Sequence, residues 1–307
     1  MIVYRELSSL TTDLGFSART LYSVARNVRK HYHEVSIPKK DGTERKLSVP
    51  DELLKRIQKS IAEKILINEE ISPYATAYRV CASPVVNAKA HLGKRCILKL
   101  DINHFFDSII FPAVKNKVFP KEKYSEANRI LLTALCIYED SVPQGAPTSP
   151  AISNIILRDF DYYIGSWCEK KNITYTRYCD DLTFSGEFEP KEVIVEVEDA
   201  LKKEGFFLNR KKTAFLKNGQ RKEVTGIVVN EKLSVSKDYR RKIRSEVYYI
   251  EKYGVEAHLS RIGSNMDKYK YLMSLFGRIN YVLSVSPGNE EMKNYREFVR
   301  NIIYKLK

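Results

Sequence analysis

The spacing of apolar residues along the chain predicts both helices and strands. An amphipathic helix over residues 51–68 is expected because apolar residues recur at helical spacing, at Leu54, Ile57, Ile61 and Ile65. Further helices are expected at about 17–30, 125–138, 149–170 and 190–204, and over most of the chain after residue 235. Strands are expected at 31–38, 45–50, 96–102, 173–178 and 181–186, with a hairpin near 223–235.

The order of these elements favours one fold class. Hairpins and helices are segregated along the chain instead of alternating regularly, which predicts an α+β fold and not a doubly wound sheet. The common nucleotide-binding loops, GxGxxG and GxxxxGK[ST], are absent from the sequence.

Composition limits the class of protein further. A chain of 307 residues with 43% hydrophobic residues can bury a substantial core. It has no apolar run near the roughly 20 residues that a membrane helix needs, and its first residues do not resemble a secretory signal. The five cysteines are widely spaced and form no CxxC pair, which favours a reducing cytoplasm over a disulfide framework.

The formal charge of +14 is concentrated in the last third of the chain. Residues 1–201 carry 28 basic and 27 acidic side chains, whereas residues 202–222 carry 8 and 1, and residues 231–307 carry 16 and 9. Aromatic residues are interleaved with these basic residues, which suits a nucleic-acid surface better than a plain solvated face.

Three aspartates are candidates for metal chemistry. Asp101 ends an apolar strand, and Asp180 and Asp181 lie at the tip of a hairpin. An isolated pair of aspartates there would be read as a solvated loop, but apolar and aromatic flanks anchor this tip. If the strands pair, the three carboxylates converge and need cations. Two Mg²⁺ ions about 3.5–4 Å apart supply that charge and support phosphoryl transfer.

Four segments in this order resemble the palm motifs of reverse transcriptases: LKLDINHFFDSI, VPQGAPTSPAISN, YTRYCDDLTFSG and GFFLNRKKTAF. The matching region runs from about residue 37 to about residue 282. Within that family the chain most resembles bacterial retron enzymes, because NAKAH (87–91) and VTG (224–226) match two of their elements. The resemblance implies a right-hand polymerase. Its fingers would span 1–95, its palm 96–230 (with about 113–145 contributing to the fingers), and its helical thumb 231–307.

The resemblance also implies roles for individual residues around the metals. Asp101 and Asp180 would bind both Mg²⁺ ions, Asp181 would be a weaker third carboxylate, and the Ile102 carbonyl could complete one site. Cys179 departs from the alanine that retron enzymes more often carry at this position, but it spares the metal ligands.

For binding of the incoming dNTP, the resemblance assigns an aromatic side chain, two loop residues and several basic side chains. Phe106 would exclude a ribose 2′-hydroxyl, and Gln144 and Gly145 would approach the nucleotide. Triphosphate contacts would come from Lys39, Lys40 and Arg45 on a basic hairpin, and from Lys212 near the leaving pyrophosphate, with Lys211 an open alternative.

The nucleic acid is expected to contact two further regions. Asn87 and His91 lie in the element before the first palm strand, where a purely structural role stays open for His91. In the thumb, Gly277 would allow close backbone approach, and Arg278 and Asn280 would touch phosphates or sugars.

The function implied by the resemblance is RNA-templated DNA synthesis in the bacterial cytoplasm. A retron enzyme would use a cognate structured noncoding RNA as template and primer, start from an internal guanosine 2′-hydroxyl and make a branched RNA–DNA. It would act in anti-phage defence with a separate effector protein. The alternatives are a group II intron-like or diversity-generating reverse transcriptase, a catalytically idle RNA-binding scaffold, and a palm-fold nucleotide cyclase.

Overall fold

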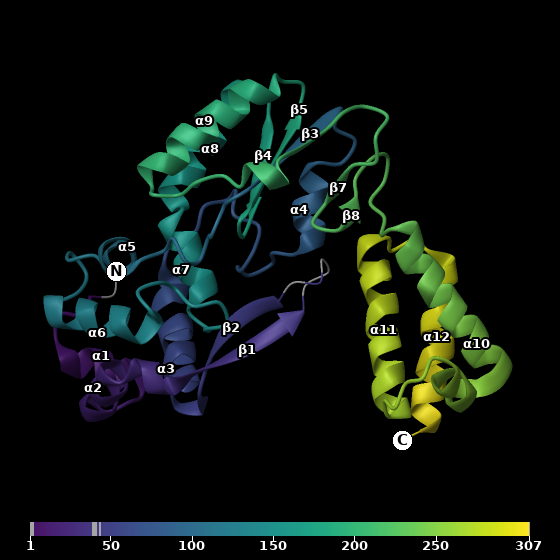
Figure 1. Ribbon diagram of the computed structural model, residues 1–307, viewed down its shortest axis with the longest axis horizontal. Coiled ribbons are helices and arrows are strands. Elements are labelled where there is room, and N and C mark those ends of the chain that lie inside the picture. The colour runs from purple at the N-terminus through teal and green to yellow at the C-terminus, as the bar shows by residue number, and fades with distance from the viewer. Residues whose placement is uncertain (1–2, 39–41, 43, 307) are drawn as a thin grey trace. The chain divides into compact units, whose positions relative to one another are not determined.

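The computed structural model describes residues 3–38, 42 and 44–306, and the chain divides into two compact units (Figure 1). Unit 1 comprises Met1–Ala82 and Leu98–Phe215, and unit 2 comprises Ser83–Ile97 and Leu216–Lys307. These bounds differ from the three regions expected from the sequence, because residues 1–82 and the central sheet share one apolar core.

A four-stranded sheet organises unit 1, with the strand order β4-β5-β3-β6. Its strands are β3 (Cys96–Asp101), β4 (Thr174–Tyr178), β5 (Asp181–Gly186) and β6 (Ala214–Leu216). β4 and β5 form an antiparallel hairpin, as their flanking turn predicts. Helices α8 (Arg158–Lys170) and α9 (Pro190–Lys203) pack against one another on one side of this sheet (Figure 1). The result is the mixed α+β fold, with an antiparallel hairpin backed by helices, that the sequence predicts.

The rest of unit 1 is a β-ribbon and a group of helices. The ribbon pairs β1 (Tyr32–Pro38) with β2 (Glu44–Pro50) in antiparallel register. The helices are α1 (Leu7–Leu14), α2 (Ala18–Arg26), η1 (Val28–His31), α3 (Glu52–Ser60), η2 (Ile61–Ile65), η3 (Leu66–Asn68), α5 (Phe111–Ala113), η4 (Val114–Val118), α6 (Glu126–Cys136), α7 (Ser149–Ile156) and η5 (Arg210–Lys212). The predicted apolar stripe over residues 51–68 is confirmed, since Leu54, Ile57, Ile61 and Ile65 are all buried.

Two predicted helices are less regular than the pattern suggests. The helix expected over 149–170 is two helices, because Leu157 has φ −92° and ψ 7° and interrupts the ladder between α7 and α8. The helix expected over 51–68 changes from α to π geometry at Ile61 and to 3₁₀ geometry at Leu66. Apolar spacing detects neither change, because the buried face continues across both.

Unit 2 combines a short helix, a small hairpin and three long helices. They are α4 (Pro84–Ala90), β7 (Glu223–Val224), β8 (Ile227–Val228), α10 (Lys237–Arg261), α11 (Lys268–Val285) and α12 (Glu290–Lys305). The apolar face predicted near the end of the chain is largely confirmed: Leu272, Leu275, Ile279 and Val282 are buried, and Phe276 packs at its edge. α10 is interrupted at Gly254, which has φ 82° and ψ 166°. No helix in the described part of the chain is long and apolar enough to span a bilayer.

Candidate active site

A cavity of about 950 Å³ opens in unit 1 at the end of the central sheet. The size is that of a small-molecule or nucleotide site. Seven of the catalytic, metal-binding and dNTP-binding residues expected from the sequence line it: Asp101, Ile102, Phe106, Gln144, Asp180, Asp181 and Lys212.

Backbone hydrogen bonds bring the two carboxylate-bearing segments together. The Ile102 N–H donates to the Asp180 carbonyl at 3.0 Å, which ties the end of β3 to the hairpin turn. On the other edge, the Asn209 N–H donates to the Asp101 carbonyl at 2.8 Å. Because alternate residues of a strand bond to opposite neighbours, the Ile102 carbonyl faces the turn as its N–H does. Asp101 and Asp180, which are 79 residues apart in sequence, therefore lie at the same end of the sheet.

The carboxylates interact with one another and with a lysine. Asp101 is buried, and Lys212 Nζ lies 2.8 Å from its Oδ2. Burial, followed by the charges of Asp180 and Asp101, raises the pKa of Asp181 from 3.8 to about 6. The hydrogen bond to Asp101 raises the pKa of Lys212. Of the two adjacent lysines, Lys212 lines the cavity and Lys211 does not.

The donor chemistry of the three aspartates fits hard divalent cations. Across the described residues, no group of three or more His, Cys, Asp or Glu side chains is already arranged to hold a metal ion. Carboxylates and a strand carbonyl are nevertheless the oxygen ligands that Mg²⁺ prefers. Burial and then the neighbouring carboxylates raise the pKa of Asp181, and a bound cation would offset the repulsion between these carboxylates.

Two adjacent phenylalanines have different surroundings. Phe105 is only 4% exposed and packs on Phe206, with ring centroids 5.8 Å apart. Phe106 is half-buried, lies 5.2 Å from the Phe105 ring and lines the cavity. Phe105 therefore serves the core and supports Phe106 from behind.

The loop after α6 lines the cavity from Tyr138 to Gln144, and Gly145 is not among the lining residues. The Ser48 N–H donates to the Gln144 carbonyl at 3.0 Å, so the loop is fixed to β2. Gly145 has φ 117°, and a Cβ there would lie 3.1 Å from the Ser48 carbonyl oxygen. Close packing on β2 thus requires this glycine. Lys39 and Lys40 lie outside the described residues, and so does the side chain of Arg45.

Cys179 is placed for packing and not for nucleophilic chemistry. It is 8% exposed, and burial raises the pKa of its thiol to about 12. A thiol with that pKa is protonated at neutral pH and is a poor nucleophile.

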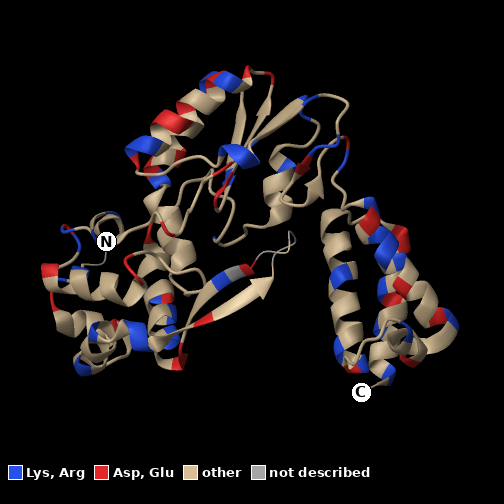
Figure 2. Cartoon of the chain, viewed as in Figure 1, with Lys and Arg blue, Asp and Glu red and all other residues tan. Residues whose placement is uncertain are grey.

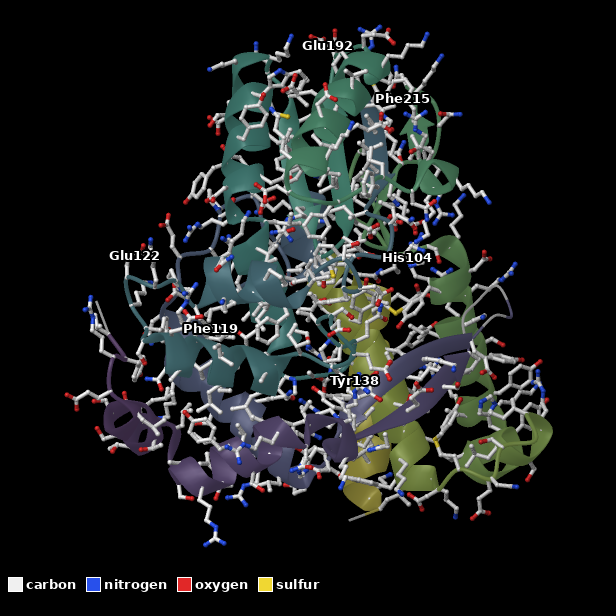
Figure 3. The ribbon with its side chains drawn as sticks, turned by 60° about the vertical axis from the view of Figure 1, so that its left-hand side comes forward. His104, Phe119, Glu122, Tyr138, Glu192 and Phe215 are labelled. Atoms are coloured by element: carbon white, nitrogen blue, oxygen red, sulfur yellow. The ribbon has the colours of Figure 1, made fainter. Side chains whose placement is uncertain are left out.

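Several cavity residues were not singled out from the sequence. They include Lys46 on β2, Tyr78, Asn209 and the rim residue Tyr138, which is labelled in Figure 3. Tyr78 has φ 58° and its hydroxyl interacts with Cys179. It lies in a segment without helical or strand periodicity, so no pattern pointed to it.

The two retron-like elements pack together inside unit 2. Thr225 Oγ1 donates to the Pro84 carbonyl at 2.9 Å, and α4 contacts both β7 and β8. This packing leaves Asn87 and His91 with no exposed surface, and burial lowers the pKa of His91 to about 3. Neither side chain can touch a nucleic acid in this conformation, so burial corrects that expectation to a packing role.

The three residues expected to contact nucleic acid from the thumb differ in how free they are to do so. Arg278 donates to both carboxylate oxygens of Glu246, one at 2.7 Å, and its side chain is 30% exposed. A phosphate contact would require it to leave Glu246. Gly277 is exposed and Asn280 is half-buried on the same helix. Figure 2 shows basic and acidic residues mixed along α10, so the basic excess of this region does not form one uninterrupted run on the helix.

Gly277 gives a direct test of the expected thumb contact. It lies within α11, and a Cβ there would meet nothing within 4 Å. Gly277→Ala should therefore raise the free energy of unfolding by about 1 kcal/mol through helix propensity. If the backbone approaches a duplex here, the same change should weaken binding of an RNA–DNA hybrid, measured by fluorescence anisotropy.

Gly288→Ala is the matched control. A Cβ added at Gly288 also meets nothing within 4 Å, and this residue lies between α11 and α12. It should leave hybrid affinity unchanged. Equal affinity of the Gly277→Ala and wild-type proteins would remove Gly277 from the candidate contacts.

Comparison with known proteins agrees with this site. Residues 37–272 match the family model described as reverse transcriptase (RNA-dependent DNA polymerase). The chain is 31% identical to the retron Mx65 reverse transcriptase of Myxococcus xanthus, covering 88% of this chain and 69% of the relative. It is 30% identical to the retron Ec86 reverse transcriptase of Escherichia coli, covering 81% and 79% respectively.

The chain therefore belongs to the RNA-directed DNA polymerases known as reverse transcriptases and, within them, to the retron reverse transcriptases.

Among solved structures, telomerase from Candida albicans matches with a TM-score of 0.48 and 11% identity, over 93% of this chain and 65% of that chain. A foamy viral protease-reverse transcriptase matches with a TM-score of 0.47 and 14% identity, over 94% and 48%. The chain spans less than two thirds of each of these two structures.

Proposed function

We propose that this enzyme reverse transcribes a cognate structured noncoding RNA into a branched RNA–DNA. The RNA would serve as both template and primer, and synthesis would start from an internal guanosine 2′-hydroxyl. The observation that carries the proposal is a cavity lined by Asp101, Asp180 and Asp181 in a chain about 30% identical to retron enzymes.

The chemistry follows from the residues at the cavity. Asp101, Asp180, Asp181 and the Ile102 carbonyl would hold two Mg²⁺ ions, which supply charge neutralisation for nucleotidyl transfer. Lys212 would exchange its contact with Asp101 for the triphosphate when the metals bind, and could then protonate the leaving pyrophosphate. Gln144 and Phe106 would orient the sugar of the nucleotide.

Residues 1–95, 96–230 and 231–307 would act as fingers, palm and thumb in this reaction. The basic excess after residue 201 supports sequence-tolerant tracking of an RNA–DNA hybrid by charge. Lys39, Lys40 and Arg45 would close over the triphosphate. In the bacterial cytoplasm the branched product would act with a separate effector protein in anti-phage defence.

The decisive experiment is to sequence the nucleic acid that co-purifies with the protein from cells carrying its native locus. We expect one structured RNA joined to DNA, with a junction that a 2′,5′-debranching enzyme cleaves. A linear DNA product would indicate an intron-like or diversity-generating enzyme, and bound RNA without any DNA would indicate an idle scaffold. Either result would contradict the proposal.

A further inference from the structure

The turn between β4 and β5 has an unusual backbone for its sequence. Tyr178 pairs with Asp181 across the hairpin, so Cys179 and Asp180 form a two-residue turn. Cys179 has φ 62°, in the left-handed region that a Cβ disfavours. Two-residue hairpin turns that need positive φ usually place glycine or asparagine there. A contact from outside the turn is therefore needed to hold Cys179 in this conformation.

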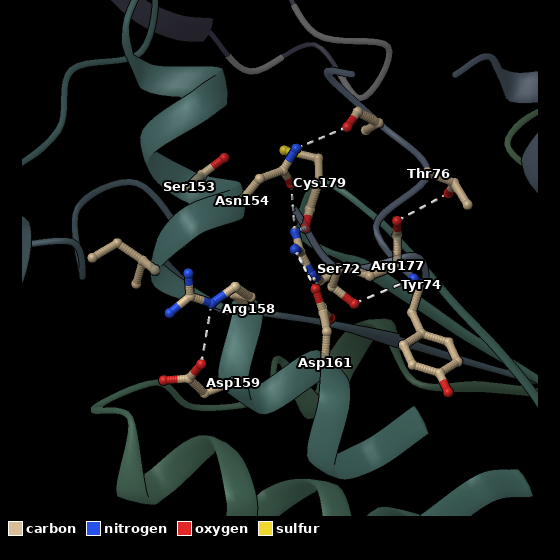
Figure 4. Close-up of polar contacts among 12 residues, drawn as sticks. Ser72, Tyr74, Thr76, Ser153, Asn154, Arg158, Asp159, Asp161, Arg177 and Cys179 are labelled. Atoms are coloured by element: carbon tan, nitrogen blue, oxygen red, sulfur yellow. Dashed lines mark hydrogen bonds and ion pairs between the residues drawn. The ribbon is translucent and has the colours of Figure 1, made fainter. Parts of the chain in front are cut away.

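Arg177 supplies such a contact from the preceding strand. Its Nη1 donates to the Cys179 carbonyl at 3.1 Å and to Asn154 Oδ1 at 3.2 Å. Its Nε and Nη2 donate to the two carboxylate oxygens of Asp161 at 2.8 Å and 2.6 Å. One guanidinium thus joins the turn to α7, which carries Asn154, and to α8, which carries Asp161 (Figure 4).

The partners of Arg177 are themselves fixed. The side chains of Arg177 and Asp161 are both 0% exposed. The Tyr175 hydroxyl donates to Asp161 Oδ1 at 2.8 Å, and Asn154 Nδ2 donates to the Ala77 carbonyl at 2.9 Å. Because these are buried and charge-assisted contacts, the guanidinium has one well-defined position.

The backbone of Arg177 is held from the opposite side. Its N–H donates to the Tyr74 carbonyl at 2.8 Å, and its carbonyl accepts from the N–H and the hydroxyl of Thr76 at 2.7 Å and 2.9 Å. A Cβ on Gly165 would lie 2.1 Å from the Tyr74 ring, so α8 provides the space in which Tyr74 packs. With the strand fixed in this way, the remaining freedom of the hairpin end lies in the turn itself.

Stability alone is a weak reason for this network. Replacing a buried ion pair by apolar side chains of similar volume is often neutral or stabilising. Arg177, Asp161 and Asn154 do not line the cavity, so they touch neither metal nor substrate directly. Asp161 and Asn154 both bond to Arg177, and Arg177 in turn donates to the Cys179 carbonyl, one residue before Asp180.

We propose that Arg177 is a positioning residue for catalysis. Anchored on Asp161, it holds the Cys179 carbonyl and thereby fixes the turn that presents Asp180 and Asp181 to the cavity. The inference rests on the proposed metal-binding role of these two aspartates. A displacement of about 1 Å at a reacting centre can reduce a rate by about 100-fold.

The first test is Arg177→Lys. Lysine keeps the charge beside Asp161, but one ammonium cannot reproduce the forked contacts to Asp161, Asn154 and the Cys179 carbonyl. Single-turnover addition of dTMP to an oligo(dT) primer on poly(rA) with Mg²⁺ should slow by roughly 100-fold. The dissociation constants for dTTP and for the primer–template should stay at their wild-type values, because the turn acts on the chemical step.

Arg158→Lys is the matched control. Arg158 lies on α8, the helix that carries Asp161, but its described partner is Asp159 in a surface ion pair and not the turn. Its replacement should leave the rate constant unchanged. A wild-type rate in the Arg177→Lys protein would overturn the proposal.

A rescue experiment separates positioning from general packing. Glycine adopts positive φ without strain, so the turn needs Arg177 less in the Cys179→Gly background. The loss of rate caused by Arg177→Lys should be much smaller in that background than in the wild-type background. An equal loss in both would mean that Arg177 acts through overall packing, which contradicts the proposal.

A second variant decides the question if Arg177→Lys does not fold. This variant combines Arg177→Met, Asp161→Leu and Tyr175→Phe. The first two changes remove the buried ion pair, and the third removes the Tyr175 hydroxyl, which donates to Asp161 in the wild-type protein. This triple variant should unfold near the wild-type temperature but extend the primer slowly, whereas a full rate would overturn the proposal.

A wild-type protein that extends this primer but makes no branched product contradicts the proposed function alone, since these comparisons need only primer extension.

Discussion

Asp180→Asn is expected to reduce the rate of primer extension by on the order of 10³-fold or more, equivalent to about 4 kcal/mol of transition-state stabilisation. The substitution keeps the size of the side chain but removes one of the charges that would bind Mg²⁺. Because the Asp180 backbone carbonyl accepts from the Ile102 N–H, the fold of the turn should persist. Single-turnover kinetics measure the rate, and filter binding measures the affinity for RNA, which should not change.

Asp159→Asn is the matched control for this prediction. Asp159 is an exposed aspartate of the same unit, and its only described ion pair is with Arg158. It should extend the primer at the wild-type rate. Undiminished synthesis by Asp180→Asn, with Asp159→Asn equally active, would show that the reaction does not use a metal held at Asp180.

Phe106→Ala is expected to let the enzyme incorporate ribonucleotides. The ring lines the cavity and is supported by Phe105, so its removal leaves space where a 2′-hydroxyl would lie. We expect the preference for dTTP over UTP, expressed as a ratio of kcat/KM values, to fall by roughly 100-fold. The rate with dTTP should change less, because the substitution leaves all three carboxylates in place.

Phe207→Ala provides the control for Phe106. Phe207 is 62% exposed and does not line the cavity. Its replacement should leave the preference between dTTP and UTP at the wild-type value. An unchanged preference in Phe106→Ala would place the sugar discrimination on another residue.

The sequence predicted those features of unit 1 that depend on local pattern. The β4–β5 hairpin, β3 and the convergence of Asp101 with Asp180 follow from apolar strands ended by turn-forming or acidic residues. The pattern did not reveal the break at Leu157, because the buried side chains of α7 and α8 keep helical spacing across it. Apolar periodicity reports which face is buried, but not whether the backbone of that face is continuous.

Other features were out of reach because they depend on tertiary packing. Asn87 and His91 are polar, and nothing in their sequence neighbours shows that β7 and β8 cover them. Arg177 was passed over as part of an apolar flank, although a charged residue inside a buried strand is itself a signal that a partner must exist. Its partner, Asp161, lies 16 residues earlier on α8, and no spacing rule connects the two.

Unit 2 is assembled from two separate stretches, Ser83–Ile97 and Leu216–Lys307. During synthesis on the ribosome, α4 emerges long before the hairpin and helices that cover it. Ala88 and Ile97 are fully buried in the folded protein, so their side chains stay exposed to solvent until more than a hundred further residues have been synthesised. A nascent chain stopped before residue 216 would keep that apolar surface exposed, which makes it a natural point for chaperone binding or for proteolytic removal of incomplete enzyme.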